Sequence, residues 1–281
     1  MPYAYKVKPG QKIKLPDYDP DDTGKVSHGE AKDELKSLNE RLTTLQEAQY
    51  AAGQNAVLIV LQAIDTGGKD GTISHVMAQF NPAGCRVEPF KAPTPDELAH
   101  DFLWRIHRVT PPKGNIAIFN RSHYEDVLVA RVHKLVSKDT WEKRYEEINN
   151  FESLLAASGT IIMKFFLYIS KEEQRERLLA REDDKDKAWK LSASDWPEHE
   201  RYDDYTAAYE DALSRCATAH APWYIVPADH KWFRDLAVAQ TIADTLDPYT
   251  AAWHEELQQR GKEALAASKK ARSTDAGAKK T

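Results

Sequence analysis

Apolar residues in this chain gather in short runs, separated by longer stretches with helical periodicity. The runs cover residues 57–61, 85–89, 116–119, 161–169 and 223–226. Short apolar runs that alternate with helices are typical of a parallel sheet whose two faces are both covered by helices. The pattern therefore predicts an α/β fold with a central parallel sheet and with ligand-binding residues at the carboxyl ends of its strands.

The segments outside this alternation predict three further parts. Over residues 28–51, leucines recur at helical spacing, which predicts an amphipathic helix lying on the core. Residues 1–27, rich in Pro, Asp and Lys, are expected to form an extended arm ahead of a domain that spans residues 28–250. Residues 251–281, rich in Ala and Lys, are expected to be a helical or disordered tail.

Residues 181–201 are highly charged and yet contain two tryptophans, Trp189 and Trp196. A solvated loop has little reason to keep two such large apolar side chains. We therefore expect a lid that packs when it closes over a ligand. A pair of surface helices anchored by the tryptophans is the alternative.

The first apolar run ends in a glycine-rich loop, residues 62–72, which reads Gln-Ala-Ile-Asp-Thr-Gly-Gly-Lys-Asp-Gly-Thr. A strand, a glycine-rich turn with a lysine and a following helix together form a phosphate-binding loop, because backbone N–H groups and the helix dipole converge on an anion. Ala63 stands where the first glycine belongs, and Asp70 replaces the Ser or Thr that would hold magnesium. An ordinary strand-to-helix turn is the alternative. The expected phosphate contacts are Thr66, Gly67, Gly68, Lys69, Asp70, Gly71 and Thr72.

Asp65 lies inside this loop. A carboxylate beside phosphate is repelled unless a divalent metal lies between them, and phosphoryl transfer uses such a metal. We therefore expect Asp65 to be a magnesium ligand, directly or through water. An aspartate that merely caps the following turn is the alternative.

A second polar cluster, residues 120–131, follows the apolar run 116–119. Arg121 is placed to bind a phosphate with two hydrogen bonds, and Glu125 and Asp126 could reach back toward a metal or a substrate. The residue at the strand tip, Asn120, is neutral. A charged helix cap is the alternative interpretation of this cluster.

A third cluster carries Arg177 and Arg181, which are four residues apart and so share one helix face. At the edge of a lid such arginines can stabilise the charge of a transferring phosphate. A solvated helix face is the alternative. Lys91, which follows the apolar run 85–89, is expected to line the acceptor pocket and to contact phosphate.

Composition narrows the protein class. Of 281 residues 39 are basic and 44 acidic, so the net charge of −5 gives no attraction to nucleic acid. Cys85 and Cys216 are far apart in the sequence and lack the spacing of metal ligands, which indicates a protein whose thiols stay reduced. The N-terminus has no apolar signal core, and no apolar stretch of about 18 residues occurs. We expect a cytoplasmic protein with neither a membrane nor a nucleic-acid partner.

Taken together, these clusters resemble those of the family 2 polyphosphate kinases, over roughly residues 5–250. The stretch 119–127, Phe-Asn-Arg-Ser-His-Tyr-Glu-Asp-Val, is similar to the class III subgroup, whereas class I members have Asn at the position of Glu125. Further matching stretches are residues 62–71, 80–84, 100–107, 114–132, 189–190 and 221–228. The resemblance implies a three-layer α/β/α P-loop kinase fold, similar to thymidylate kinase, with a helical lid.

The resemblance also implies an activity: transfer of the terminal phosphate of inorganic polyphosphate to AMP and ADP, forming ADP and ATP. It implies magnesium, with manganese as a substitute, and a homodimer or homotetramer. The implied catalytic residues are Asp65, Lys69, Arg121, Glu125, Asp126, Arg177 and Arg181, with Asp65 and Asp126 on the metal. Lys91, Arg131 and Lys190 are expected to add to the phosphate contacts. The nucleotide is expected to contact Asn81, Phe90, Arg121 and Glu125.

Without the resemblance, the residues predict a P-loop phosphotransferase and leave its donor open. The second hypothesis is an ATP-dependent kinase of the nucleoside monophosphate type. The third is a phosphate-binding regulatory protein without turnover.

Overall fold

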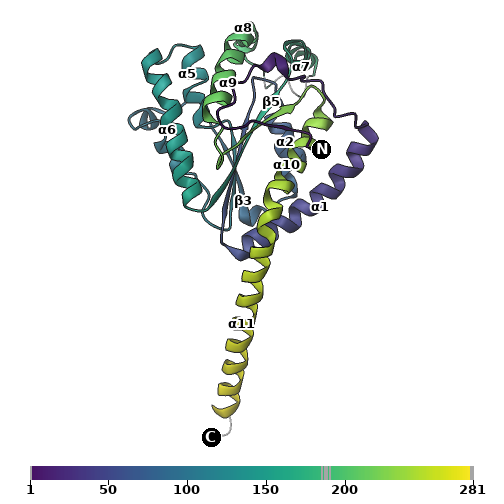
Figure 1. The fold of residues 1–281 in the computed structure, drawn as a ribbon, viewed down its shortest axis with the longest axis vertical. Helices are drawn as coiled ribbons and strands as arrows, with labels where there is room; N and C mark the ends of the chain where they lie inside the picture. The colour runs from purple at the N-terminus through teal and green to yellow at the C-terminus, as the bar shows by residue number, and fades with distance from the viewer. Residues whose placement is uncertain (1, 185, 187–188, 190, 279–281) are drawn as a thin grey trace.

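The protein folds around one six-stranded sheet with strand order β1-β6-β5-β2-β4-β3 (Figure 1). The structure is a computed structural model that describes residues 2–278 except 185, 187, 188 and 190; of residues 273–278 it describes the backbone alone. The strands are β1 (Tyr5–Lys6), β2 (Ala56–Gln62), β3 (Cys85–Pro89), β4 (Ile116–Asn120), β5 (Thr160–Tyr168) and β6 (Trp223–Pro227). Strands β2 to β6 pair in parallel, and β1 pairs antiparallel to β6. The predicted α/β fold with a central parallel sheet is confirmed.

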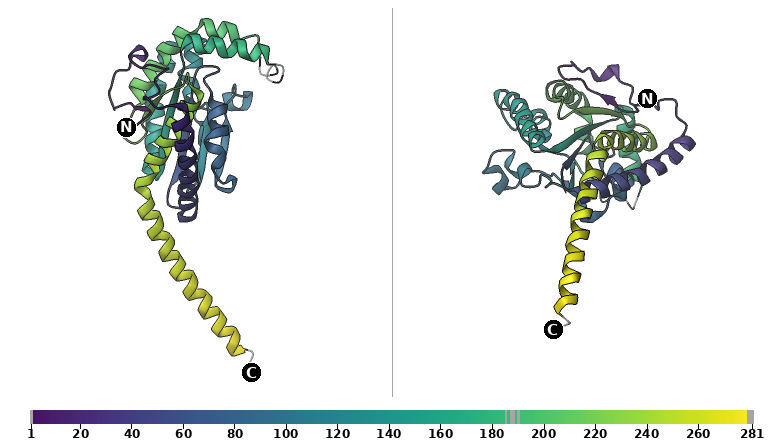
Figure 2. Two further views of the ribbon diagram at one scale, coloured as in Figure 1. Left: turned by 90° about the vertical axis from the view of Figure 1, so that its right-hand side faces the viewer. Right: turned by 60° about the horizontal axis from the view of Figure 1, so that its bottom comes forward.

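Helices cover both faces of the sheet (Figure 1). Helices α1, α2 and α10 pack together on one face, and α5, α6 and α9 on the other. Helices α7 and α8 lie at one end of the body, and α11 leaves the opposite end (Figure 2). The bounds are α1 (His28–Ala52), α2 (Lys69–His75), α3 (Pro95–Leu98), α4 (Trp104–His107), α5 (Val129–Val132), α6 (Lys138–Ala157), α7 (Lys171–Asp183), α8 (Asp195–Glu200), α9 (Tyr202–Cys216), α10 (Lys231–Leu246) and α11 (Thr250–Ala278).

Helix α1 matches the helix predicted over residues 28–51. Ser27 caps it: the Ser27 hydroxyl accepts a hydrogen bond from the Glu30 N–H while the Glu30 carboxylate accepts one from the Ser27 N–H. Gly53 ends the helix with a φ of 64°, a left-handed conformation that glycine adopts without strain. Leu42 and Leu45 are buried on its core face.

Two features of the sheet differ from the pattern read off the sequence. Strand β3 is an edge strand whose middle residue Val87 is 42% exposed, so it is not buried on both faces. The N-terminal segment adds β1 to the other edge and buries Val7, Ile13 and Leu15. A strand of two residues is too short to give an alternating pattern, so the sequence could not predict it.

The two tryptophans of residues 181–201 lie in different environments. The indole N–H of Trp196 donates to Oε1 of Glu182 at 2.7 Å, whereas Trp189 is 78% exposed. Helix α11 is anchored by Trp253, which is fully buried and donates to Oδ1 of Asn55 at 3.0 Å. Beyond that anchor the helix projects away from the body (Figure 1). Within the described part of the chain, no helix combines the length and the apolar character needed to cross a membrane.

A cluster of fully buried charged and polar groups supports the segment that follows β4. Lys164 of β5 donates to the Glu152 carboxylate at 2.5 Å, to Tyr124 Oη at 2.9 Å and to the Cys216 carbonyl at 2.7 Å. His123 contacts the same carboxylate at 3.1 Å. Burial opposes the charge of Glu152, but Lys164 and His123 outweigh it, so the pKa of Glu152 is lowered. The cluster ties residues 121–124 to β5 and α6.

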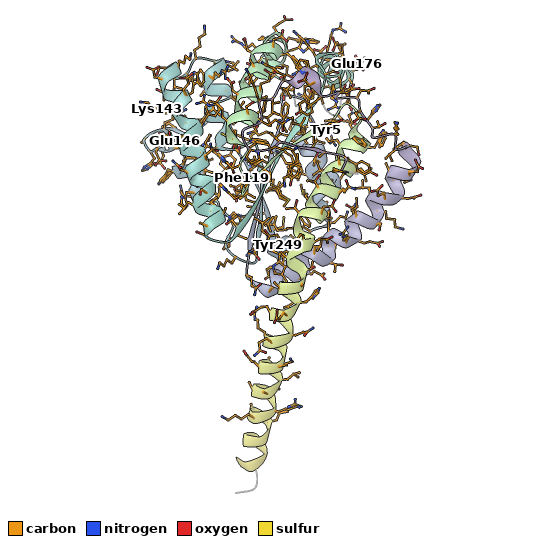
Figure 3. All side chains as sticks on the ribbon, in the orientation of Figure 1. Tyr5, Phe119, Lys143, Glu146, Glu176 and Tyr249 are labelled. Atoms are coloured by element: carbon orange, nitrogen blue, oxygen red, sulfur yellow. The ribbon has the colours of Figure 1, made fainter. Side chains whose placement is uncertain are left out.

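We expect Glu152→Gln to lower the free energy of unfolding by about 3–5 kcal/mol, because it leaves the Lys164 ammonium buried without a carboxylate. Urea denaturation followed by circular dichroism measures this loss. Glu146→Gln is the matched control, since Glu146 points outward from the same helix (Figure 3). A loss no larger in Glu152→Gln than in the control would contradict the assigned role of the cluster.

Candidate active site

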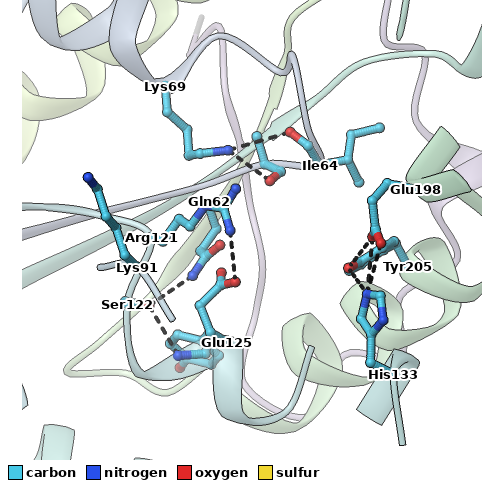
Figure 4. A network of polar contacts seen from close by, with 12 residues as sticks. Gln62, Ile64, Lys69, Lys91, Arg121, Ser122, Glu125, His133, Glu198 and Tyr205 are labelled. Carbon is cyan, nitrogen blue, oxygen red and sulfur yellow. Dashed lines mark hydrogen bonds and ion pairs between the residues drawn. The ribbon is translucent and has the colours of Figure 1, made fainter. Parts of the chain in front are cut away.

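Parallel pairing of β2 with β4 brings the two main polar clusters to one edge of the sheet. Leu61 is opposite Asn120 in the register, and the Arg121 N–H donates to the Leu61 carbonyl at 3.1 Å. The glycine-rich loop (residues 62–72) and the cluster after β4 therefore begin side by side (Figure 4). This is the edge at which open α/β sheets bind ligands.

Close packing fixes the shape of the glycine-rich loop. Gly68 caps helix α2 with a φ of 96°, and a Cβ on it would clash with the guanidinium of Arg234, a buried residue of α10. A Cβ on Gly67 would clash with the Cβ of Ala63. Ala63 thus fills space beside the turn, and the turn requires glycine at position 67. Behind the loop, Arg234 is neutralised by Asp235, at 2.7 Å.

Lys69 is buried inside the loop. Its ammonium group donates to the carbonyls of Ala63 at 3.1 Å and Ile64 at 3.5 Å (Figure 4). Burial, followed by the positive charge of Arg121, lowers the pKa of Lys69 to about 8. A phosphate bound at the loop would raise the pKa of Lys69 again, because its negative charge stabilises the charged form of the ammonium group.

Two arginines approach the loop from other elements. Arg121, with a φ of 66°, lies 3.6 Å from the Glu125 carboxylate. Arg181 of α7 lies 3.7 Å from the Asp65 carboxylate and 3.5 Å from Asp195 of α8. Arg181 therefore connects the glycine-rich loop to the helical segment above it.

These residues line two adjoining cavities. One, of about 600 Å³, is bordered by residues of the glycine-rich loop and by four cations, and we call it the cationic cavity. The other, of about 320 Å³, is bordered by three tyrosines and by carboxylates, and we call it the tyrosine cavity. Asp65 and Arg121 border both cavities. The four cations are Lys69, Lys91, Arg121 and Arg181, and the tyrosines are Tyr202, Tyr205 and Tyr209.

Arg177 is expected on the transferring phosphate, but in the structure its guanidinium binds backbone carbonyl groups. Its guanidinium donates to the carbonyls of Thr66 at 3.0 Å, Ala228 at 2.6 Å and Asp229 at 2.9 Å. Its side chain is 8% exposed and borders neither cavity. Arg177 holds the glycine-rich loop in place, whereas Arg181, one helical turn later, faces the cationic cavity.

Asp126 and Arg131 are likewise not brought to the cavities. Asp126 pairs with Arg144 at 3.0 Å, and burial raises the pKa of Asp126. Arg131 pairs with Asp211 at 2.6 Å. Glu125 and Asp126 are consecutive in a short 3-10 turn, His123–Asp126, in which successive side chains point about 120° apart. Only Glu125 of the two borders the tyrosine cavity.

The remaining expected residues divide between the cationic cavity and other places. Phe90, Lys91, Thr66 and Asp70 border it together with the loop glycines, and Asp70 accepts a hydrogen bond from Asn120 at 2.8 Å. Thr72 is fully buried in α2 and borders neither cavity. Asn81 caps a short turn by accepting from the Ala83 N–H at 2.9 Å, also away from both cavities. Lys190 lies outside the described residues.

The tyrosine cavity was missed by the sequence analysis. Its tyrosines lie on α9 at spacings of three and four residues, which places them on one helix face, a signal that was available. Gln174 is a second omission: it donates to the Asp65 carbonyl at 3.3 Å and accepts from His199 at 2.8 Å. An isolated glutamine on a helix gives no such signal.

The described oxygen donors at the site fit a magnesium ion that is held partly by substrate and water, and do not form a metal site made of protein ligands alone. Among the described residues, no three His, Cys, Asp or Glu side chains gather closely enough to hold a metal ion. Magnesium in phosphoryl-transfer enzymes is bound by one or two carboxylates together with substrate phosphates and water. The Asp65 carboxylate, which is 34% exposed and borders both cavities, fits that requirement.

Comparison with known proteins gives the family. The sequence profile described as "Polyphosphate kinase 2 (PPK2)" matches residues 25–252. The chain belongs to this family. It is 49% identical over 245 residues to an "AMP/ADP-polyphosphate phosphotransferase" of Meiothermus ruber, with 86% of this chain and 92% of the relative covered.

Two further similarities agree with this membership. An "ADP-polyphosphate phosphotransferase" of Rhodopseudomonas palustris is 46% identical over 243 residues, with 82% of this chain and 84% of the relative covered. The crystal structure of polyphosphate kinase 2 from Arthrobacter aurescens superposes with a TM-score of 0.83 at 40% identity, covering 88% of this chain and 92% of that one. The family resemblance read from the motifs is confirmed.

We expect Gly68→Ala to lower the free energy of unfolding by about 1–3 kcal/mol and to weaken the binding of inorganic tripolyphosphate about tenfold or more, because the alanine Cβ is disfavoured at positive φ and clashes with Arg234. Denaturation and titration calorimetry measure the two effects. Gly261→Ala, at a helical position with open space around it, should leave the affinity unchanged and should not lower the stability, because alanine favours a helix more than glycine does. Wild-type stability and affinity in Gly68→Ala would refute the packing argument.

Proposed function

We propose that this protein transfers the terminal phosphoryl group of inorganic polyphosphate to AMP and ADP, forming ADP and ATP. The observation that carries the proposal is the pair of adjoining cavities, one cationic and one lined by tyrosines, that share Asp65 and Arg121. Family membership and the names of the relatives from Meiothermus ruber and Rhodopseudomonas palustris support it.

The cationic cavity suits the donor. Polyphosphate is a polyanion without a nucleoside, so it needs positive charges and backbone N–H groups rather than a base pocket. Lys69, Lys91 and Arg181 supply charge from three different elements, and the glycine-rich loop supplies N–H groups at the start of α2. A protein with a net charge of −5 can bind a polyanion when its cations are gathered in this way.

The tyrosine cavity suits the acceptor nucleotide. Its lining has more carboxylates than cations, with Glu125, Asp195 and Glu198 against Arg121, so it offers little positive charge to a long phosphate chain. Tyrosine rings offer flat apolar surfaces with polar edges, which fit a nucleoside. We therefore assign the nucleoside to this cavity, with its phosphates directed toward Arg121. Glu125, at the class-distinguishing position, would help to decide between AMP and ADP.

The shared residues Asp65 and Arg121, together with Lys69, account for the chemistry. The positive charges of Lys69 and Arg121 would stabilise the charge on the transferring phosphoryl group as it passes between the cavities. Glu125 holds the Arg121 guanidinium from the acceptor side. Asp65 would hold magnesium, or manganese in its place, and the bound metal would neutralise phosphate oxygens during transfer.

The remaining parts of the proposal rest on composition and sequence pattern, and for the assembly on the resemblance in motifs. We propose a cytoplasmic homodimer or homotetramer without nucleic-acid or membrane partners. Within each subunit, an arm of residues 1–27 precedes a catalytic domain of residues 28–250 with a lid near 181–201, and residues 251–281 form a tail. Light scattering of the purified protein tests the assembly.

The direct test incubates purified protein with magnesium, polyphosphate and either AMP or ADP, in the absence of ATP, and follows nucleotides by chromatography. The proposal predicts ADP and ATP from AMP, and ATP from ADP. Absence of product from both acceptors would refute it. In that case, ADP formed from AMP and ATP without polyphosphate would favour the ATP-dependent kinase, and polyphosphate binding without any turnover would favour the regulatory protein.

We expect Asp65→Asn to reduce turnover about 100-fold or more while the affinity for polyphosphate changes less than about threefold, because the amide keeps the shape of the loop but loses the charge that holds the metal. Steady-state kinetics with ADP and calorimetry with polyphosphate measure the two effects. Asp183→Asn, an exposed carboxylate at the end of α7, is the control. Unchanged turnover in Asp65→Asn would remove Asp65 from the metal site.

The lowered pKa of Lys69 predicts a pH dependence. Lys69 is charged below its pKa of about 8 and neutral above it, so kcat/KM for polyphosphate should fall as the pH rises through about 8. Lys69→Arg keeps the charge at all these pH values and should abolish the fall, at a lower maximum rate because the fit is poorer. The same fall in Lys69→Arg would assign it to another group.

A further inference from the structure

The tyrosine cavity contains a compact polar cluster whose mutual hydrogen bonds the proposed reaction does not use. We propose that this cluster, formed by His133, Glu198 and Tyr205, positions helix α8 over the tyrosine cavity and thereby sets the affinity for the acceptor nucleotide. The inference rests on the proposed function for the identity of that ligand. The hydrogen bonds among the three side chains act through the position of α8, so in this role they are positioning residues, while the ring of Tyr205 also forms part of the cavity wall.

The cluster joins three elements through one carboxylate. Tyr205 of α9 donates to Oε2 of Glu198 at 2.8 Å, and Nε2 of His133, which follows α5, lies 3.0 Å from Oε1 of the same carboxylate (Figure 4). His133 Nε2 also lies 3.2 Å from the Tyr205 hydroxyl. Burial and the hydrogen bond to Glu198 raise the pKa of Tyr205, which therefore stays protonated and remains the donor.

Among the described residues, polar side chains attach α8 on two sides of the tyrosine cavity: to α7, where Trp196 also contacts Glu182, and through the cluster to α5. Toward the glycine-rich loop, Asp195 contacts Arg181 at 3.5 Å and His199 contacts Gln174 at 2.8 Å. Toward α5, Glu198 contacts His133, in a part of the site well separated from Lys69 and Arg121 (Figure 4). Helix α8 therefore spans the cavity between α7 and α5.

The attachment also controls a charge that faces the ligand. Glu198 borders the tyrosine cavity, where a free carboxylate would repel the phosphates of an incoming nucleotide. His133 and Tyr205 engage both of its oxygens, which satisfies the carboxylate within the cavity wall. The side chains of His133 and Glu198 are 30% and 23% exposed, so the contact is shielded from bulk water for most of its surface.

The placement predicts an effect on the acceptor and not on the donor. All three residues border the tyrosine cavity, and none borders the cationic cavity. Loss of the attachment should therefore raise KM for AMP and ADP while KM for polyphosphate stays the same. A general loss of stability would instead change both constants or the amount of active protein.

The test compares Tyr205→Phe and Glu198→Gln with wild type, and uses Glu200→Gln, an exposed carboxylate on the same helix, as the matched control. Kinetics give KM for ADP, AMP and polyphosphate, and calorimetry gives the Kd for ADP alone. Each variant should raise KM and Kd for ADP about tenfold, the expected effect of losing one hydrogen bond to a charged group. The double variant should raise the Kd for ADP no further than the more strongly affected single variant does, because both changes break the same attachment.

Three outcomes would overturn the inference: unchanged KM and Kd for ADP, equal increases in KM for ADP and polyphosphate, or tighter ADP binding in Glu198→Gln. Tyr205→Phe removes only the hydroxyl group and keeps the ring. If Glu198→Gln does not fold, the result for Tyr205→Phe alone decides whether the inference holds. If wild type binds ADP but transfers no phosphate, the proposed function fails while the calorimetry still tests the attachment. The two failures are therefore distinguishable.

Discussion

The site depends on the parallel pairing of β2 with β4. This pairing places the glycine-rich loop and the segment from Arg121 to Glu125 at the same edge of the sheet, in a register fixed by the hydrogen bond from Arg121 to the Leu61 carbonyl. A shift of one residue would exchange the faces of the strand and separate the two segments. The buried Lys164–Glu152 pair strengthens the constraint, because it fastens the segment after β4 to β5 and α6.

Buried cations shape the glycine-rich loop before any ligand binds. Arg177 holds the Thr66 carbonyl from one side, and Arg234 packs against Gly68 from another. Neither guanidinium contributes a free charge, since Arg177 lies on carbonyl groups and on Glu173, and Arg234 on Asp235. In the proposed function, the charge for a phosphate would thus come from Lys69 and from the other cations around the cationic cavity. One set of cations therefore fixes the shape of the loop, and another set faces the cationic cavity.

The sequence predicts the framework well because strands and loops leave local signals. Apolar runs marked β2 to β6, and the Gly-Gly-Lys pattern marked the loop around Lys69. Side-chain direction could not be predicted: Arg177 and Arg181 share a helix face, yet of the two only Arg181 borders the cationic cavity. The tyrosines of α9 leave a helical signal in the sequence, but the rest of the tyrosine cavity does not, since His133 and Glu198 meet Tyr205 only after α5, α8 and α9 pack together.

The central claim is that donor and acceptor occupy different cavities and meet between Asp65 and Arg121. A crystal structure with ADP, magnesium and a non-hydrolysable polyphosphate analogue tests it most directly. The account predicts the adenosine among the three tyrosines of α9, the phosphate chain beside Lys69 and Lys91, and the metal on Asp65. Adenosine bound in the cationic cavity, or both ligands bound in one cavity, would contradict it.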